Sequence, residues 1–160
     1  MSDPSPPVNP HKQALLETGF WGRAAAGGII LARSSQRFLL AHRGEGTLQA
    51  GTWGTWGGAC DGDETPIETV RREMQEEAGI QQEMELHELY TFRHESGFSY
   101  TNFLAIIEEE FEPVLNWETQ GFGWFEFNQW PDPLHFGTRK LIKDPSSLSI
   151  FETQLALLTG

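Results

Sequence analysis

The sequence is poor in cysteine, in basic side chains and in long apolar runs. Its 160 residues include one cysteine, Cys60, so no disulfide can form within the chain and a secreted disulfide scaffold is excluded. Lys and Arg number 11 against 23 Asp and Glu, and the net charge of -12 argues against nonspecific nucleic-acid binding and against binding to anionic membranes. The longest apolar run, Ala24–Ala32, is far shorter than the about 20 residues of a membrane helix. These absences predict a globular, cytoplasmic protein.

The composition that remains is sufficient for one packed domain. Hydrophobic residues make up 38% of the chain, and its length is close to that of a domain of about 100–150 residues. Four of the first ten residues are proline, so residues 1–12 are expected to form a flexible tail. Residues 13–160 show neither an internal repeat nor a second linker and are predicted to form a single domain.

The order of apolar segments predicts an α+β fold, with a mixed β-sheet flanked by helices. Segments rich in β-branched and aromatic residues predict strands at 23–33, 37–43, 84–93, 98–107 and 122–127. Helices are predicted at 66–78, 134–143 and 147–158. The glycine-rich stretch 44–58 is expected to be a loop with one short strand.

The helix predicted at Pro66–Ala78 has clear start and stop signals. Thr65 is a good N-cap, and proline suits the first helical position because its missing N–H would have no partner there. Glu68, three residues after Thr65, completes a capping box, and Gly79 ends the helix.

Three carboxylates share one arc of this helix. Ile67, Val70, Met74 and Ala78 form the apolar stripe expected to face the core. Glu73, Glu76 and Glu77 lie beside that stripe, and like charges one turn apart repel by a few tenths of a kcal/mol. A divalent cation such as Mg²⁺ or Mn²⁺ would relieve that repulsion, because hard cations prefer oxygen ligands. The alternative is a solvated acidic helix face.

The wider segment carries a spaced motif. From Gly58 to Ile80 the sequence reads GACDGDETPIETVRREMQEEAGI. The fixed positions, in order, are Gly58, Glu64, Arg72, Glu73, Met74, Glu76, Glu77, Gly79 and Ile80. This spacing resembles the signature of the Nudix hydrolases at every specified position. The order of strands and helices also resembles that family, which implies an α/β/α sandwich-like fold over most of the chain.

The resemblance implies a chemistry and roles for the residues of the motif. Family members cleave a diphosphate linkage with water and a divalent metal. Glu73, Glu76 and Glu77 match the family's metal-binding positions, and Glu73 also matches a general base. The backbone carbonyl of Gly57 or Gly58 matches a further metal ligand. Arg72 is expected to orient a carboxylate of the motif, and Glu64 to brace the loop before the helix.

Candidates outside the motif are fewer. Glu118 resembles a catalytic or metal-binding glutamate that some members carry in a late loop. Arg43 and, more weakly, Arg23 resemble arginines that contact the substrate phosphate. Trp56 stands where many relatives have proline, a change expected to reshape the floor of the substrate pocket.

Several readings of the function remain open. The short domain favours a nucleoside diphosphate or triphosphate as substrate, with ADP-ribose and dinucleoside polyphosphates as alternatives. A Nudix module that senses a nucleotide without cleaving it is the alternative of another class, although such modules usually lose motif glutamates. An isoprenoid diphosphate isomerase on the same fold is disfavoured, because Cys60 is no obvious match for its catalytic cysteine. The family also includes dimers, so a homodimer is one state to test.

Overall fold

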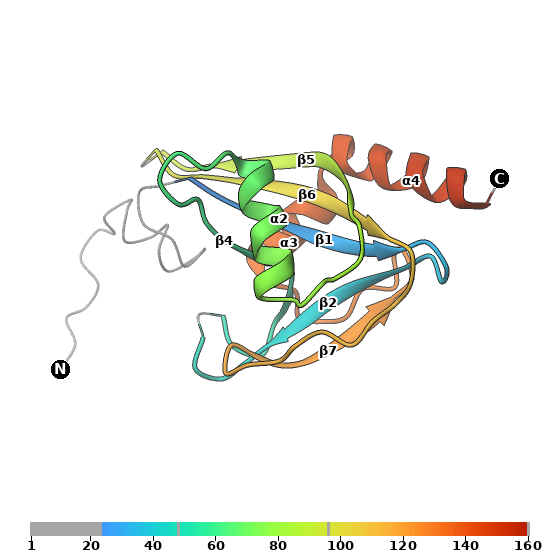
Figure 1. Cartoon of the computed structure of the whole chain (residues 1–160), viewed down its shortest axis with the longest axis horizontal. Helices are drawn as coiled ribbons and strands as arrows, with labels where there is room; N and C mark the ends of the chain where they lie inside the picture. Colours follow the sequence, from blue (N-terminus) through green and yellow to red (C-terminus); the bar gives the residue numbers. More distant parts are fainter. Residues whose placement is uncertain (1–23, 48, 96, 160) are drawn as a thin grey trace.

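The computed structural model describes residues 24–47, 49–95 and 97–159 (Figure 1). Its strands are β1 (Ala24–Ala32), β2 (Arg37–Arg43), β3 (Trp53–Gly54), β4 (Trp56–Ala59), β5 (Glu85–Arg93), β6 (Ser99–Ile107) and β7 (Thr119–Phe125). Its helices are α2 (Pro66–Glu76), α3 (Phe136–Lys143) and α4 (Pro145–Thr159). The expected tail at residues 1–12 and the candidate Arg23 lie outside the described residues.

In the part of the chain that the structure describes, one mixed sheet of seven strands forms the centre of the fold. β1 runs parallel to β6 along its whole length, and β5 extends this edge by antiparallel pairing with β6. On its other side β1 pairs first with β4, through Ala25–Gly28, and then with β2, through Ile30–Ala32. β2 in turn pairs with β3 and β7. The expected mixed sheet flanked by helices, an α+β fold, is therefore observed.

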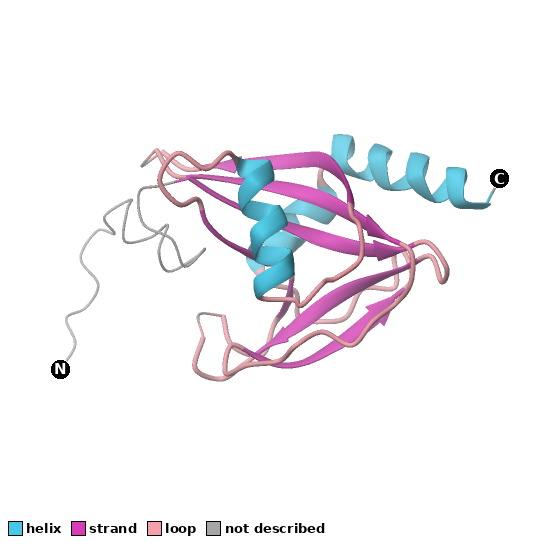
Figure 2. Ribbon diagram, viewed as in Figure 1, coloured by secondary structure: helices cyan, strands magenta, loops and turns pink. Residues whose placement is uncertain are grey.

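The helices cover opposite faces of the sheet, as Figure 2 shows for α2 in front and α3 behind. Neighbouring residues of β1 point to opposite faces, as in any strand. Ile30 packs in the cluster that contains Val70 and Met74 of α2, whereas Ile29 packs with Leu141 of α3 and Phe151 of α4. The centre of the sheet is therefore buried on both sides, which explains why β1 is apolar throughout.

Two differences between the predicted and the observed strands follow from strand pairing. β7 begins at Thr119 instead of 122 because its polar first residues pair with the end of β2, where Arg43 lies opposite Thr119. The predicted loop 44–58 holds two short strands, β3 and β4, because β3 pairs with β2 and β4 pairs with β1. Both differences arise from pairing between distant segments, which local composition does not report.

The predicted apolar stripe of α2 is wrong at one position. Val70 and Met74 are fully buried and lie over Gly28, where an added Cβ would be 3.0 Å from Met74 Cε. Ile67 is one turn earlier, beyond this contact, and is 43% exposed. The helix also ends at Glu76, two residues before the predicted end, with Glu77 as the C-cap.

Candidate active site

Glycine at the end of β4 allows α2 to bring a carboxylate against the sheet. A Cβ added to Gly58 would lie 2.5 Å from Glu73 Cδ, so any side chain there would collide with the carboxylate. Thr65 caps α2 by accepting from the Glu68 N–H, and the Glu68 carboxylate accepts from the Thr65 N–H in return. The capping box therefore sets where the helix starts, and with it the position of Glu73 beside Gly58.

Arg72 joins the loop to the helix through several carboxylates. Its Nε and Nη2 donate to the two oxygens of Glu64 at 2.8 and 2.9 Å, the bidentate geometry that suits a guanidinium. Its Nη1 donates to Glu73 Oε2 at 2.8 Å, and Nη2 also donates to the Ala59 carbonyl at 3.1 Å. Arg72 therefore holds one oxygen of Glu73 in place while Glu64 holds Arg72.

The surroundings of Glu64 and Glu73 shift their pKa values in opposite directions. The hydrogen bond from Arg72 is the main reason that the pKa of Glu64 falls to about 2. Glu73 is only 9% exposed, and its burial raises its pKa above the usual range despite the opposing charge of Arg72. The negative charges of Glu77 and Glu76 raise the Glu73 pKa further. Glu73 is therefore the more basic carboxylate of the pair.

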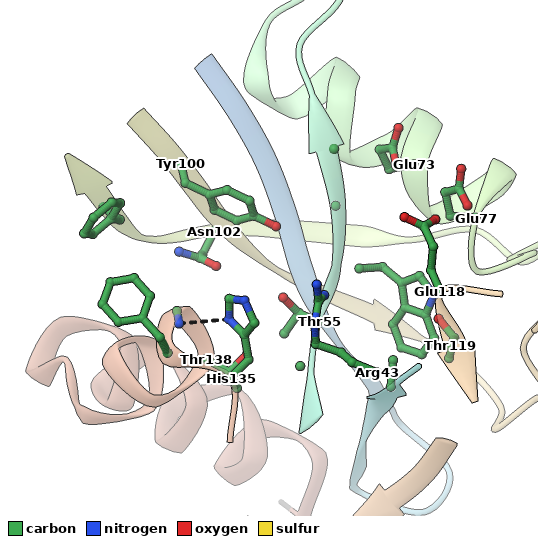
Figure 3. Close-up of a pocket in the computed structure, with 18 of the residues that line it drawn as sticks. Arg43, Thr55, Glu73, Glu77, Tyr100, Asn102, Glu118, Thr119, His135 and Thr138 are labelled. Atoms are coloured by element: carbon green, nitrogen blue, oxygen red, sulfur yellow. Dashed lines mark hydrogen bonds between the residues drawn. The ribbon is translucent and has the colours of Figure 1, made fainter. Parts of the chain in front are cut away.

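A cavity of about 360 Å³ opens beside this helix, and Figure 3 shows the residues around it. Glu73 and Glu77 reach it from α2, and Glu118 reaches it from the segment just before β7. Arg43, the last residue of β2, lies in the middle of the lining. Three carboxylates and one guanidinium thus face the same space, with the backbone of Gly57 and Gly58 along one wall.

The pairing of β2 with β7 brings Glu118 to Arg43. The Gly44 N–H donates to the Glu118 carbonyl at 2.9 Å, directly after the pairing of Arg43 with Thr119. Asn116 Oδ1 accepts from the Glu118 N–H at 2.9 Å, and its Nδ2 donates to Glu77 Oε2 at 3.3 Å. This loop therefore links Glu118 to the carboxylates of α2. Burial lowers the pKa of Arg43, while the charge of Glu118 opposes that change.

Comparison with known proteins identifies the family. The family model described as NUDIX domain matches residues 22–144, most of the chain. The chain belongs to the Nudix family.

Two Nudix relatives illustrate the similarity. A Mycobacterium tuberculosis protein named "Putative 8-oxo-dGTP diphosphatase 3" is 36% identical over 129 residues, which are 74% of this chain and 59% of that protein. The chain thus spans less than two thirds of that relative's length. The crystal structure of a MutT NUDIX hydrolase from Burkholderia pseudomallei has a TM-score of 0.61 and 28% identity, over 77% of this chain and 97% of that one.

A third similarity extends over more of the chain. A Nudix hydrolase from M. smegmatis, RenU, has a TM-score of 0.59 and 25% identity, and the match covers 88% of each chain. The fold around the cavity is therefore the Nudix fold.

The structure brings most of the candidates from the sequence to one place. The cavity lining includes Arg43, Trp56, Gly57, Gly58, Glu73, Glu77 and Glu118. Glu76 is not part of this lining, its side chain is 61% exposed, and it is 3.5 Å from Arg72. Arg72 and Glu64 lie behind the carboxylates, where they position Glu73 instead of facing the cavity.

The other end of the cavity holds residues that sequence reasoning did not single out. They are Phe92, Asn102, His135, Phe136, Thr138 and Lys140. They come from β5, β6 and the start of α3, so no local motif groups them. One local signal in the sequence is the stretch from Tyr90 to Phe103, which is rich in aromatic residues and contains Phe92.

The donor set suits a divalent cation, although no cluster of ligands is preformed. No three Asp, Glu, His or Cys side chains within 24–47, 49–95 and 97–159 converge closely enough to hold a metal by themselves. Glu73 lies against Gly58, a glycine that leaves the backbone open to its carboxylate, and Glu77 lines the same cavity one turn later. Their oxygens are the hard ligands that such cations prefer. The residues present therefore fit a divalent metal that binds to oxygen atoms.

The described helices include none that could cross a bilayer: each is too short or too polar to do so.

Proposed function

We propose that this protein is a Mg²⁺-dependent Nudix pyrophosphohydrolase of a nucleoside triphosphate or diphosphate. The observation that carries the proposal is the convergence of Glu73, Glu77 and Glu118 with Arg43 on one cavity beside Gly58. Mn²⁺ has the same ligand preferences and is the second candidate metal. The name of the M. tuberculosis relative supports an oxidised purine nucleoside triphosphate as the first substrate to test.

In this proposal the residues around the cavity have different roles in hydrolysis. A bound divalent metal would lower the pKa of water and neutralise charge on the phosphate oxygens. Arg43 donates hydrogen bonds to a phosphate and stabilises the negative charge that develops on it. Glu73 or Glu118 accepts the proton of the attacking water, and Arg72 keeps Glu73 oriented toward the cavity. The water oxygen bonds to one phosphorus while the bridging P–O bond of the diphosphate breaks, and the bridging oxygen keeps the electron pair and leaves with the other phosphate.

Glu77 provides the test of the metal site. Mg²⁺-dependent hydrolysis would be measured by chromatography on ordinary and oxidised nucleoside triphosphates, nucleoside diphosphates, dinucleoside polyphosphates and ADP-ribose. Glu77→Gln removes a charged ligand while keeping its shape, so we expect turnover to fall at least about 10²-fold with the fold intact. Glu152→Gln on the exposed side of α4 changes the same charge away from the cavity and should leave turnover unchanged. An active Glu77→Gln protein would contradict the metal assignment.

The screen also decides between the alternatives. Cleavage restricted to ADP-ribose or dinucleoside polyphosphates would replace the proposed substrate class. Tight nucleotide binding without a metal-dependent product would favour a sensor module, against which the complete set of motif glutamates argues. A cytoplasmic location and a homodimer remain predictions, testable by fractionation and by light scattering.

A further inference from the structure

The end of the cavity away from the carboxylates has an apolar wall and two polar side chains. Phe92 and Phe136 meet edge to face with ring centroids 5.5 Å apart, and both line the cavity. Asn102 and His135 point into the same space in Figure 3. An aromatic wall offers a flat ligand a surface to pack on, while polar groups beside it select among such ligands.

The orientation of Asn102 is set by a bulge in β5. The pairing of β5 with β6 shifts register between Glu88 and Thr91, which leaves the backbone of Tyr90 outside the regular ladder. Ser147 Oγ of α4 accepts from the Tyr90 N–H at 3.0 Å, and Asn102 Nδ2 donates to the Tyr90 carbonyl at 2.9 Å. A carbonyl only accepts, so the amide nitrogen must face Tyr90 and Asn102 Oδ1 remains to accept from a ligand.

The orientation of His135 is set by the start of α3. Its Nδ1 accepts from the Gly137 N–H at 3.0 Å and thereby caps the helix. A backbone N–H only donates, so the neutral ring must carry its proton on Nε2. Burial lowers the pKa of His135 to about 4, aided by the charges of Arg43 and Arg139, which keeps the ring neutral near pH 7. His135 therefore has an Nε2–H donor to offer to the cavity.

We propose that Asn102 and His135 bind the edge of a nucleobase and select one in which a carbonyl oxygen adjoins a ring N–H. This inference rests on the proposed function, in which the substrate is a nucleotide. His135 Nε2–H would donate to the base carbonyl, and Asn102 Oδ1 would accept from the ring N–H. Phe92 and Phe136 would pack against the base, while Arg43 and the carboxylates lie toward the phosphates.

A carbonyl beside a ring N–H matches this pair better than an amino group does. One donor and one acceptor on the protein satisfy one acceptor and one donor on the base. An exocyclic amino group has two N–H donors, and Asn102 Oδ1 could accept only one of them from a base that reaches this buried position. Hypoxanthine and guanine carry the matching edge, and 8-oxoguanine carries it twice.

The test measures binding of nucleoside monophosphates, which have no diphosphate to cleave. Inosine 5′-monophosphate has the matching edge, adenosine 5′-monophosphate has an amino group there, and purine riboside 5′-monophosphate has neither group. All three ligands carry the same ribose phosphate. Differences between their Kd values, measured by titration calorimetry, therefore come from the edge of the base. We expect inosine monophosphate to bind about tenfold or more tightly than either of the others, from the cost of an unpaired buried group. Equal or tighter binding of either competitor would overturn the proposal.

Substitutions of His135 and Asn102 test whether these two side chains cause the preference for inosine monophosphate. His135→Asn keeps a good N-cap but removes the Nε2–H donor, so the preference for inosine monophosphate should fall severalfold or more. Glu152→Gln, on the exposed side of α4, is a change outside the cavity lining and should leave the preference intact. Asn102→Ala, if its melting curve shows a folded protein, should abolish the preference. A preference unchanged in His135→Asn would also overturn the proposal.

This measurement is independent of hydrolysis. A protein that prefers inosine monophosphate but cleaves no diphosphate would support the base site and contradict the proposed function. A protein that cleaves nucleotides but binds the three monophosphates equally would support the proposed function and contradict the base site.

Discussion

At the scale of single residues, Arg72 determines the electrostatics of the site. It pairs with Glu64 through two hydrogen bonds and with Glu73 through one. The first pairing lowers the pKa of Glu64, whereas burial outweighs the second and raises the pKa of Glu73. One arginine therefore keeps a structural glutamate ionised and orients a neighbouring carboxylate that stays more basic.

The pairing of Glu64 with Arg72 predicts a specific loss of stability in acid. The folded pKa of Glu64 is about 2, below the ordinary 4.5, so its contribution is full above pH 4.5 and is lost as the pH falls toward 2. Urea midpoints measured between pH 5 and pH 2 should fall less steeply in Glu64→Gln than in the natural protein. Glu152→Gln is the control and should follow the natural protein. Parallel curves for Glu64→Gln and the natural protein would contradict the assigned pKa.

At the scale of elements, the start of α2 is stabilised by both halves of its capping box. Thr65 Oγ1 accepts from the Glu68 N–H at 3.3 Å, and Glu68 Oε1 accepts from the Thr65 N–H at 2.9 Å. The same turn contains Thr69, whose hydroxyl donates to Glu64 Oε1 at 2.8 Å. The helix that presents Glu73 is thus tied to the loop before it.

Removing the cap should weaken the protein measurably. Thr65→Ala leaves the Glu68 N–H without its side-chain acceptor, so we expect the free energy of unfolding to fall by about 1 kcal/mol. Urea denaturation followed by circular dichroism measures the change. Thr65→Ser restores a hydroxyl acceptor and should recover most of the loss. A Thr65→Ala protein as stable as the natural one would show that α2 is held by packing alone.

At the scale of the whole molecule, one sheet separates two apolar clusters. The cluster under α2 includes Met74, and the cluster under α3 and α4 includes Leu141 and Phe151. β1 contributes Ile30 to the first cluster and Ile29 to the second. Because both clusters share this strand, detaching β1 from one cluster would also expose the apolar side chains of the other. The molecule should therefore unfold as one unit.

Substitutions on the two faces test this cooperativity. Met74→Ala and Leu141→Ala each remove a fully buried side chain, and each should lower the free energy of unfolding by about 2–5 kcal/mol. Each substitution should move one unfolding transition to a lower urea concentration. Tryptophan fluorescence and circular dichroism should give the same midpoint for that transition. Leu157→Ala, at a side chain that is 67% exposed, should change the free energy of unfolding by less than about 0.5 kcal/mol. Two transitions, each sensitive to one substitution, would show that the faces unfold separately.

The sequence by itself determined the features that depend on local spacing. The N-cap of α2 at Thr65 and the shared face of Glu73 and Glu77 follow from helical geometry within one segment. The Nudix motif was readable for the same reason, because its members lie within 23 residues of one another. The central strands were predicted because burial on both faces requires continuous apolar runs.

Only the tertiary structure decided what meets those carboxylates. Glu118 reaches Arg43 because β7 pairs with β2, and that pairing also moved the start of β7 to Thr119. Asn102 and His135 face one cavity because β6 and α3 converge there, with Asn102 oriented by a bulge in β5. Contacts of this kind join residues far apart in the chain and depend on which strands pair, a choice made by the free energy of the whole packed sheet instead of any local pattern.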